Sequence, residues 1–319
     1  MNRIFRTFPL LALVAVPALA IARPPLIYHH VTKLAAHPGH TVRLVLSQQD
    51  VVIHVAPDNS VTVSTDIWAH AGSAEAKVKI VTRLAPKIST QDGNVVILSP
   101  THNSWGWPFN FSGSPQARVT VTMPVTMAVN YRLGSGDFRF VNPGAANLIK
   151  GDSGSGDVMV KSASTRLAAK TGSGDIFVAL HQADPSAPVQ LRTGSGDVNF
   201  AGTVDSLNVS TGSGDIGISS ASAKQALLSS GSGDITAHWQ NLAAGASLKA
   251  RSGSGDLVMF FPAGSKLGGT ISTGSGEVNT DFAATIHSNR HSYTLAGGNG
   301  AIQLNARTGS GDITLRKGG

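Results

Sequence analysis

Nine carboxylates that occupy one position of a repeated motif are the residues of this sequence best placed to do chemistry. Each follows a Gly-Ser-Gly tripeptide, and the motif recurs at intervals of 18 to 22 residues from Gly134 through Gly274 and once more at Gly309. Paired carboxylates can hydrolyse glycosidic bonds, and carboxylates in glycine-rich turns can bind calcium. The nine acids are Asp137, Asp157, Asp175, Asp197, Asp215, Asp234, Asp256, Glu277 and Asp312.

The uniformity of this set favours a structural role over catalysis. An active site interrupts a repeat with special residues at one level, whereas here an acid returns in each copy. The calcium-binding β-roll repeat has a period of about nine residues, which this motif does not match. We therefore interpret the nine acids as structural turn residues and assign no catalytic residue, metal or cofactor to the chain. Bound calcium is the alternative.

Basic residues stand two positions before the motif in five of the nine copies. Carboxylates stacked about 4.8 Å apart repel one another, and nearby cations would offset that repulsion. We therefore expect these side chains, together with hydrogen bonds from backbone amides, to stabilise the turn acids. The five residues are Arg132, Lys170, Arg192, Arg251 and Arg307.

The clearest departure from the repeat is a short segment with four aromatic residues, Trp105, Trp107, Phe109 and Phe111. Their spacing of two would place the rings on one face of an extended chain, although Pro108 weakens the prediction of a strand. Clustered aromatic rings can bind sugars or a partner protein. Two interpretations stay open: a binding surface, and a cap over the first coil of the repeat.

The residues around each motif predict strands. Apolar residues recur four and six positions after the first glycine, as at Val198 and Phe200, while the residue between them varies, as at Asn199. This alternation is typical of a strand with one buried face. Stacked copies would bury continuous apolar rows, which predicts an all-β fold: a β-solenoid, a right-handed parallel β-helix with coils of roughly 20 residues, over 126–319. An antiparallel barrel or sandwich of hairpins is the alternative.

Glycine has a physical role in such a turn, because a sharp corner needs positive φ or a close approach of backbone. Residues 23–125 are β-rich but lack the clean repeat, so they form either a β-sandwich or degenerate coils that cap the solenoid. Strand-like segments are 41–46, 51–55, 61–63, 78–81, 95–98 and 119–123, and no strong helical stretch is visible.

Residues 1–22 have the organisation of a signal peptide. Arg3 and Arg6 precede a short apolar run over 8–16, and alternating alanines at 18–22 supply a cleavage signal. No later apolar run reaches the 18 residues that a membrane-spanning helix needs. We therefore predict a periplasmic, secreted or cell-surface protein with no integral membrane segment after cleavage.

Composition excludes several function classes. The chain has no cysteine, which excludes disulfides, thiolate metal sites and a cysteine nucleophile. Its net charge is +7, and the 25 basic residues less Arg3 and Arg6 leave 23 against 18 acidic ones. Because the basic residues are scattered, with no run of five, we expect weak affinity for anionic surfaces and no specific nucleic-acid binding.

The repeat also resembles a known family. Threonine or serine precedes Gly-Ser-Gly-Asp, a short Ile/Val-x-Val run follows it, and a segment such as Val-Thr-Val-Thr-Met-Pro at 119–124 leads into the repeats. Over about residues 40–319 this pattern is similar to the bacterial putative-adhesin domain, once a domain of unknown function, and to head domains of putative autotransporter adhesins. The resemblance implies an extracytoplasmic β-solenoid and supplies no catalytic residues.

These patterns predict a non-enzymatic, extracytoplasmic β-solenoid that serves as an adhesin or as an envelope-associated binding or structural protein. Its partner would be an envelope component, a polysaccharide or a protein. The alternative is a carbohydrate-active β-helix enzyme, a lyase or glycosidase, which would need a cluster of acidic or basic residues at one coil level.

Overall fold

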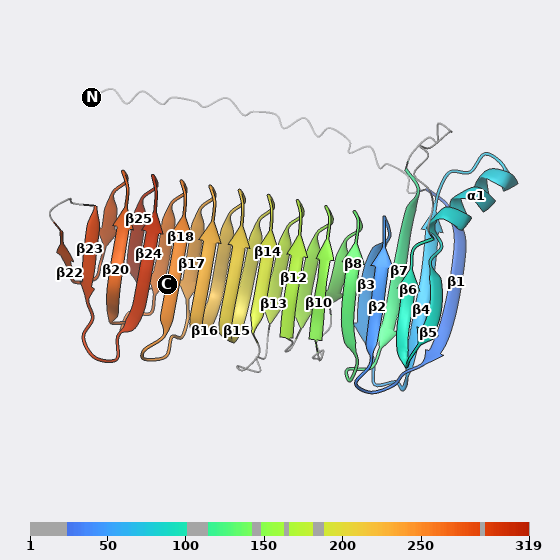
Figure 1. Cartoon of the computed structure of the whole chain (residues 1–319), viewed down its shortest axis with the longest axis horizontal. Helices are drawn as coiled ribbons and strands as arrows, with labels where there is room; N and C mark the ends of the chain where they lie inside the picture. Colours follow the sequence, from blue (N-terminus) through green and yellow to red (C-terminus); the bar gives the residue numbers. More distant parts are fainter. Residues whose placement is uncertain are drawn as a thin grey trace, which may run out of the picture.

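The computed structural model describes residues 24–100, 114–141, 148–162, 166–180, 188–287 and 291–318, and nearly all of its regular structure is β. The all-β prediction is therefore confirmed. Most strands belong to two ladders of parallel strands that run along the length of the molecule (Figure 1). We call one strand of the first ladder, its turn and the next strand of the second ladder a coil.

The first ladder contains the strands that precede the turns, and the second ladder contains the strands that follow them. In spatial order the first ladder is β6 (Asn94–Leu98), β2 (Thr41–Leu46), β8 (Ala128–Leu133), β10 (Leu148–Ser153), β12 (Arg166–Thr171), β14 (Val189–Thr193), the ends of β15 (Val198–Thr211) and β16 (Ile216–Ser230), β18 (Ser247–Ser252), β24 (Ile302–Thr308) and β20 (Leu267–Thr273). The second ladder is β7 (Gln116–Met123), β3 (Asp50–Val55), β9 (Phe138–Val141), β11 (Val158–Ser162), β13 (Ile176–Leu180), the starts of β15 and β16, β17 (Ile235–Trp239), β19 (Leu257–Phe261), β25 (Ile313–Lys317) and β21 (Val278–Thr280).

One apolar core lies between the two ladders. Every second residue of most strands points into it: Ile176 is 0% and Ile216 is 1% exposed, whereas Asn199 is exposed. Equivalent residues of successive repeats pair directly, as Ile176 does with Val158 on one side and Val198 on the other. The inward and outward positions that the repeat predicts are therefore confirmed at these residues.

The coils do not stack in sequence order at either end of the molecule. At the N-terminal end, β2 and β3 lie between β6 and β7 on the outside and β8 and β9 on the inside. At the C-terminal end, β24 and β25 lie between β18 and β19 and the outer pair β20 and β21. The last segment of the chain is thus inserted into the stack rather than added to its end.

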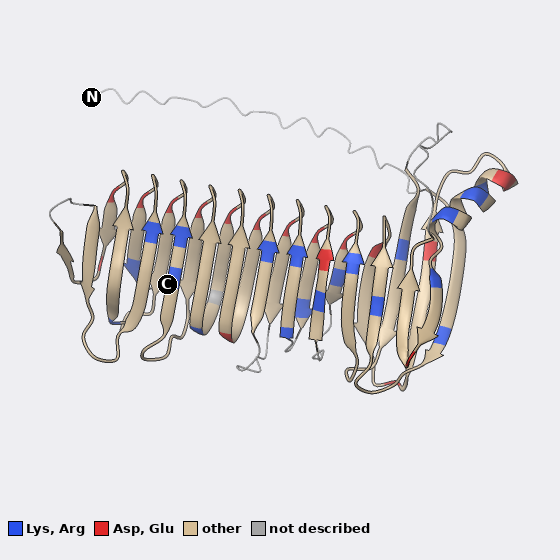
Figure 2. Ribbon diagram, in the orientation of Figure 1, with Lys and Arg blue, Asp and Glu red and all other residues tan. Residues whose placement is uncertain are grey.

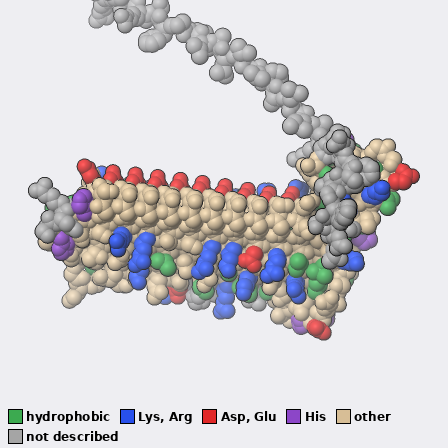
Figure 3. All heavy atoms as spheres, turned by 45° about the horizontal axis from the view of Figure 1, so that its top comes forward, with side chains coloured by type: hydrophobic (Ala, Val, Ile, Leu, Met, Phe, Trp, Pro, Cys, Tyr) green, Lys and Arg blue, Asp and Glu red, His purple; other side chains and the backbone are tan. Residues whose placement is uncertain are grey.

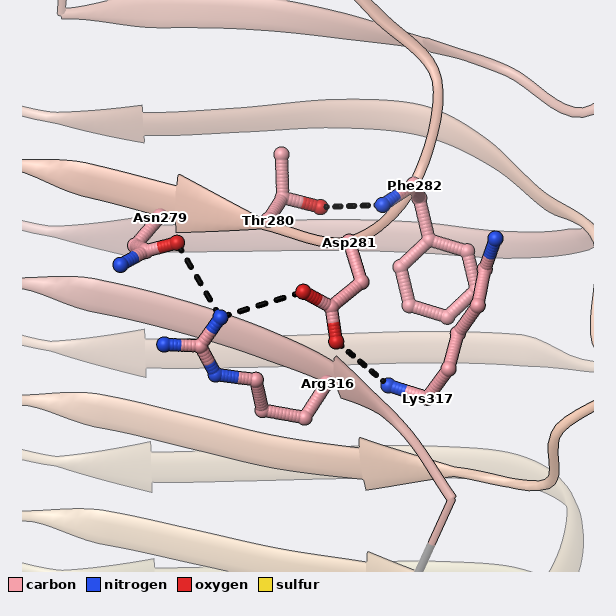
Figure 4. Close-up of polar contacts among 6 residues, drawn as sticks. All are labelled: Asn279, Thr280, Asp281, Phe282, Arg316 and Lys317. Atoms are coloured by element: carbon pink, nitrogen blue, oxygen red, sulfur yellow. Dashed lines mark hydrogen bonds and ion pairs between the residues drawn. The ribbon is translucent and has the colours of Figure 1, made fainter.

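Polar contacts hold this inserted segment against its outer neighbour (Figure 4). Arg316 Nη1 donates to Asp281 Oδ1 over 3.1 Å and to Asn279 Oδ1 over 3.2 Å. The backbone amide of Lys317 donates to Asp281 Oδ2 over 3.0 Å, and the Lys317 ammonium lies 5.0 Å from the ring centre of Phe282. These contacts join β25 to β21 and to the two residues that follow it.

Additional antiparallel strands cover both ends of the stack, whose edges would otherwise be free to pair with other chains. At the N-terminal end β4 (Ser60–Trp68) pairs with β7, β1 (Leu26–Ala35) pairs with β4, and β5 (Lys87–Gln91) pairs with β6. At the C-terminal end β23 (Ser292–Ala296) pairs with β20, and β22 (Ala284–Ile286) pairs with β23.

One helix, α1 (Ala74–Leu84), corrects the prediction for this region, where no strong helical stretch was expected and 78–81 was predicted as a strand. The Ser73 hydroxyl accepts a hydrogen bond from the amide of Ala76 and caps the helix. Ile80 and Leu84 lie four residues apart on one face, are buried, and pack with Ile67. The β-branched residues of 78–81 favoured a strand, but the cap and this apolar spacing outweigh them. No helix within the described ranges is long and apolar enough to cross a membrane.

Candidate functional site

The repeated turns lie in a row along one edge of the molecule, where the first ladder passes into the second (Figures 2 and 3). Glycine is required there because neighbouring turns almost touch. A Cβ atom at Gly156 would lie 2.0 Å from the carbonyl oxygen of Gly136, and one at Gly154 would lie 2.3 Å from that of Gly134. These glycines do not have positive φ, so close approach of backbone is the reason for them.

A serine or threonine stands before eight of the nine Gly-Ser-Gly turns and holds the turn closed from inside, whereas Leu133 precedes the turn at Gly134. The hydroxyl of Thr193 accepts a hydrogen bond from the amide of Gly196 over 3.1 Å and donates to the carbonyl of Gly174 in the neighbouring coil over 2.9 Å. One side chain thus closes its own turn and joins it to the next. The same pair of bonds is made by Ser153, Thr171, Thr211, Ser230, Ser252, Thr273 and Thr308.

Each Asp among the turn acids accepts a hydrogen bond from the backbone amide of the acid in an adjacent coil. The amide of Asp197 donates to Asp175 Oδ1 over 2.8 Å, and the amide of Asp215 donates to Asp197 Oδ1 over 2.8 Å. The carboxylates therefore form one continuous row, the acid ladder. In spatial order it is Asp50, Asp137, Asp157, Asp175, Asp197, Asp215, Asp234, Asp256, Asp312 and Glu277.

The residues at the two ends of the acid ladder, Asp50 and Glu277, both depart from the Gly-Ser-Gly-Asp motif. Asp50, which sequence analysis missed, begins the ladder from a turn without glycine, Ser47-Gln48-Gln49-Asp50. Glu277 ends it: its amide donates to Asp312 Oδ1, but no described coil lies beyond it to donate to its own carboxylate. The longer side chain of glutamate is tolerated at this last position because its carboxylate does not have to accept a hydrogen bond from a neighbouring amide.

Gln49 stands where the other turns have their second glycine, and its side chain holds the first turn closed. Its side chain is 1% exposed, and Oε1 accepts hydrogen bonds from the amides of Ser47 and Gln48 and from the Ser99 hydroxyl. Its Nε2 atom donates to the carbonyl of Leu84 over 2.7 Å. Gln49 therefore attaches the C-terminal end of α1 to the start of the turn edge.

The basic residues before the turns do not neutralise the turn acids. Within the described ranges the ion pairs join His29 to Asp66, Lys224 to Asp205 and Arg316 to Asp281, and none includes a member of the acid ladder. The expected contribution of Arg132 and its equivalents is therefore wrong, whereas the expected hydrogen bonds from backbone amides are present. Backbone amides stabilise the carboxylates instead, because they lie within hydrogen-bond distance and the basic side chains do not.

The predicted aromatic site lies outside the described residues: Trp105, Trp107, Phe109 and Phe111 all fall in 101–113. Within the described ranges no group of three or more His, Asp or Glu side chains is placed to hold a metal ion. Each Asp of the acid ladder has one carboxylate oxygen engaged by an amide, as the structural interpretation of these residues requires.

A hollow of about 430 Å³ opens on the outward face of the first ladder, near its N-terminal end. It brings together charged groups from separate coils: Arg43 from β2, Arg132 from β8 and Asp152 from β10, with Asp92 from the β5–β6 turn. Tyr131 lies beneath it, and its burial, reinforced by the charge of Asp152, raises the pKa of its hydroxyl, which stays neutral. Sequence analysis missed this site because these charged residues come from three strands and a turn and share no motif.

Comparison with known proteins gives one family match and matches to several solved structures. A family model described as Toastrack DUF4097 matches residues 42–316. A solved structure named a putative lipid binding protein, from Parabacteroides distasonis ATCC 8503, has a TM-score of 0.54 and 16% identity and covers 91% of this chain and 97% of its own. A putative adhesin from Bacteroides fragilis NCTC 9343 has a TM-score of 0.48 and 13% identity, with the same coverage. No curated protein matches the chain.

Proposed function

The chain belongs to the Toastrack DUF4097 family, and from this premise we propose that it is a non-enzymatic, extracytoplasmic protein that binds a component of the cell envelope. In this proposal the stacked coils form a right-handed β-solenoid with coils of about 20 residues. Residues 1–22 act as a signal peptide that directs the chain to the periplasm or the cell surface. A lipid-bearing component is one candidate partner, in keeping with the name of the Parabacteroides distasonis structure.

The observation that supports this function best is the regular outward face of the first ladder. Its strands direct every second side chain outward, most of them exposed, and neighbouring strands lie about 4.8 Å apart. Successive coils therefore offer groups in the same orientation along the whole stack. Such a surface suits an extended partner with a repeating structure.

Fractionation and co-sedimentation test the proposal. We expect the full chain, expressed in a bacterial host with a C-terminal tag, to lose residues 1–22 and to leave the cytoplasmic fraction. Purified processed chain should then sediment with isolated cell envelopes. A matched variant that lacks residues 2–22 should stay in the cytoplasm. Cytoplasmic retention of the full chain with an intact N-terminus, or no sedimentation with envelopes, would overturn the proposal.

The hollow favours one second candidate, a carbohydrate-active lyase or glycosidase. It gathers two carboxylates, Asp92 and Asp152, and two guanidinium groups, Arg43 and Arg132, from different coils. Incubation with acidic and neutral polysaccharides, followed by measurement of new reducing ends, separates the two candidates. Under the binding proposal no turnover is expected. Turnover that is lost in Asp152→Asn would replace it with the enzyme.

A further inference from the structure

The fold gathers basic residues that are scattered in the sequence onto one face. The outward side of the first ladder carries, among the described residues, nine basic side chains and one acidic one, Asp152. Figures 2 and 3 show them as a row on the front strands, below the acid ladder. Eight of the nine form what we call the basic stripe: Arg43, Arg132, Lys150, Lys170, Arg192, Lys249, Arg251 and Arg307.

Strand register sets the spacing of the stripe. Lys170 pairs with Arg192, and Arg251 pairs with Arg307, so each pair lies on adjacent strands. Seven strand steps separate Arg132 from Arg307, which corresponds to about 34 Å at 4.8 Å a step. A second row stands two residues earlier on the strands, about 7 Å away, and contains the other three members. The stripe is therefore long and narrow.

The cations of the stripe are available to a partner. All eight side chains are exposed, and none makes a hydrogen bond or ion pair with a described residue. The ninth basic residue of the face, Arg166, is engaged elsewhere and is left out of the stripe. Eight positive charges on one face repel one another, and the single anion among them, Asp152, stands in register between Arg132 and Lys170 and offsets only part of that repulsion. A polyanion laid along them would remove this repulsion.

We propose that the basic stripe binds a single linear acidic polysaccharide, lengthwise along the stack of coils. This inference rests on the proposed envelope-binding function and names its partner class and its surface. The carboxylate or phosphate groups of the polysaccharide pair with the lysine and arginine side chains. Its hydroxyl groups meet the neutral polar residues between them.

Those neutral residues distinguish a polysaccharide from other polyanions. Between β2 and β24 the second row has four amide side chains, Asn130, Gln190, Asn208 and Asn305, and its two apolar members there are Ala168 and Leu227. An amide side chain both donates to and accepts from a sugar hydroxyl. Ser210 and Ser229 fill the gap between Arg192 and Arg251 in the first row. A partner that touched only the cations would need none of these groups.

A nucleic acid and a lipid bilayer fit this surface less well. The described residues of the outward face include no aromatic side chain. The bases of a single-stranded nucleic acid therefore have no ring to stack on, and no aromatic ring is present to insert into a bilayer. The acid ladder runs parallel to the stripe along the neighbouring edge and would repel a broad anionic surface (Figure 3). A single narrow chain can lie on the stripe and avoid it.

The hollow lies at one end of the stripe and would receive the end of the polysaccharide. Arg43 and Arg132 belong to the stripe and also line the hollow, together with the amide side chains of Asn94 and Asn130. The cationic and amide groups bind the acidic group of a terminal sugar, and the carboxylates of Asp92 and Asp152 in the same hollow accept hydrogen bonds from its hydroxyl groups. The stripe would then bind the length of the chain, and the hollow would fix its position.

Binding of polygalacturonate oligosaccharides of graded length to the processed chain tests the proposal. The stripe variant carries Lys170→Gln, Arg192→Gln, Arg251→Gln and Arg307→Gln. The matched control carries Lys33→Gln, Lys77→Gln, Arg139→Gln and Lys266→Gln, which remove the same charge from exposed positions off the face. Calorimetry at low salt should show affinity about tenfold or more lower for the stripe variant, and little changed for the control. Circular dichroism and melting would establish that both fold.

Two further measurements make the geometry testable. Affinity should rise with oligosaccharide length until the ligand spans about 34 Å, and then level off. It should fall as salt is raised, and fall less steeply for the stripe variant. Equal binding by the stripe variant and the control, or affinity that does not depend on length, would overturn the proposal.

Competing ligands separate this inference from the broader function. The same chain is measured against vesicles of phosphatidylglycerol and phosphatidylcholine and against a 20-nucleotide single-stranded DNA. Tighter stripe-dependent binding to either probe than to polygalacturonate would overturn the polysaccharide assignment. If the stripe variant still sediments with envelopes as the wild type does, the stripe is wrong and envelope binding stands. If the wild type does not sediment, the envelope-binding proposal itself fails.

Discussion

The ring of Tyr131 occupies the space in which a side chain at residue 151 would stand. The two residues pair directly on adjacent strands β8 and β10, and a Cβ atom at Gly151 would lie 2.4 Å from Tyr131 Cγ and 2.3 Å from its carbonyl oxygen. Tyr131 is buried and stacks on Phe138 with ring centres 3.9 Å apart. The large ring fits into the core because the next coil has no side chain at this place.

Gly151→Ala should therefore destabilise the protein. The added methyl group would overlap both the ring and the backbone of Tyr131, and overpacking of this kind costs about 1–3 kcal/mol. Lys150→Ala, at the exposed neighbouring position, should change the free energy of unfolding by less than about 0.5 kcal/mol. Chemical denaturation of the three chains measures both changes. A Gly151→Ala variant as stable as the wild type would show that Tyr131 can move aside.

Sequence analysis predicted the repeated part of this fold well because its constraints are local. Apolar alternation around Val198 and Ile216 gave the inward face, and regular spacing gave the pairing of equivalent residues. The family resemblance is also confirmed. The exceptions needed the structure: Gly151 breaks the apolar pattern to make room for Tyr131, and Gly269 has φ +109 where its backbone meets Leu304. Neither cause is visible from the residue's own neighbours in the sequence.

The turn glycines make a second prediction. A Cβ atom at Gly196 would lie 2.0 Å from the carbonyl oxygen of Gly174, which belongs to backbone and cannot swing away. Gly196→Ala should lower the melting temperature by more than about 5 °C. Ser195→Ala makes the adjacent change in the same turn at an exposed position, and it should lower the melting temperature by less than about 1 °C. Equal effects of the two changes would mean that the turns can move apart.

The acid ladder predicts that hydrogen-bond acceptance, rather than charge, is what Asp197 contributes. Its Oδ1 atom accepts from the amide of Asp215, and an asparagine keeps such an acceptor. Asp197→Asn should melt within about 2 °C of the wild type at high salt and above it at low salt, because one repulsive neighbour is gone. Asp197→Ala should melt lower at both salt concentrations. The interpretation fails if the asparagine and alanine variants are equally unstable.

Calcium should be dispensable for folding. Each Asp carboxylate of the acid ladder is already engaged by a backbone amide, as Asp175 is by the amide of Asp197. Melting curves of the processed chain in chelator and in millimolar calcium should nearly coincide. Magnesium at the same concentration controls for ionic strength. A large rise in melting temperature with calcium alone would assign the ladder to cation binding.

The remaining features could not be predicted, because they depend on which distant strands pair. Asp50 joins the acid ladder because β2 lies beside β8. Asp312 comes before Glu277 in the ladder because β25 is inserted between β19 and β21. In the same way Arg43 stands in one row with Lys150 because β2 lies beside β8. The prediction of weak affinity for anionic surfaces rested on the scatter of basic residues in the sequence, which the fold removes.

The contacts of Asp281 predict how acid affects the C-terminal insertion. The hydrogen bond from the Lys317 amide lowers the pKa of Asp281 below its ordinary value of 3.8, Arg316 lowers it further, and partial desolvation opposes both. A carboxyl whose pKa is lower in the folded state stabilises that state above its ordinary pKa, and this contribution is lost as pH falls through the lowered value. The attachment of β25 should therefore be intact at neutral pH and weaken below about pH 4.

Asp281→Asn isolates this contribution, because it removes the titrating charge and keeps the shape of the side chain. The wild type should melt above the variant at pH 7, and the gap should shrink steadily as pH falls from about 4 towards 2. Amide hydrogen exchange in β25 should be faster in the variant at pH 7 and similar in both chains at the lowest pH. Asp58→Asn serves as the matched control, because Asp58 is an exposed acid in the loop between β3 and β4. Its melting temperature should show no such convergence with that of the wild type. A gap between wild type and Asp281→Asn that is the same at every pH would show that the insertion is held by packing and backbone pairing alone, without help from the carboxylate.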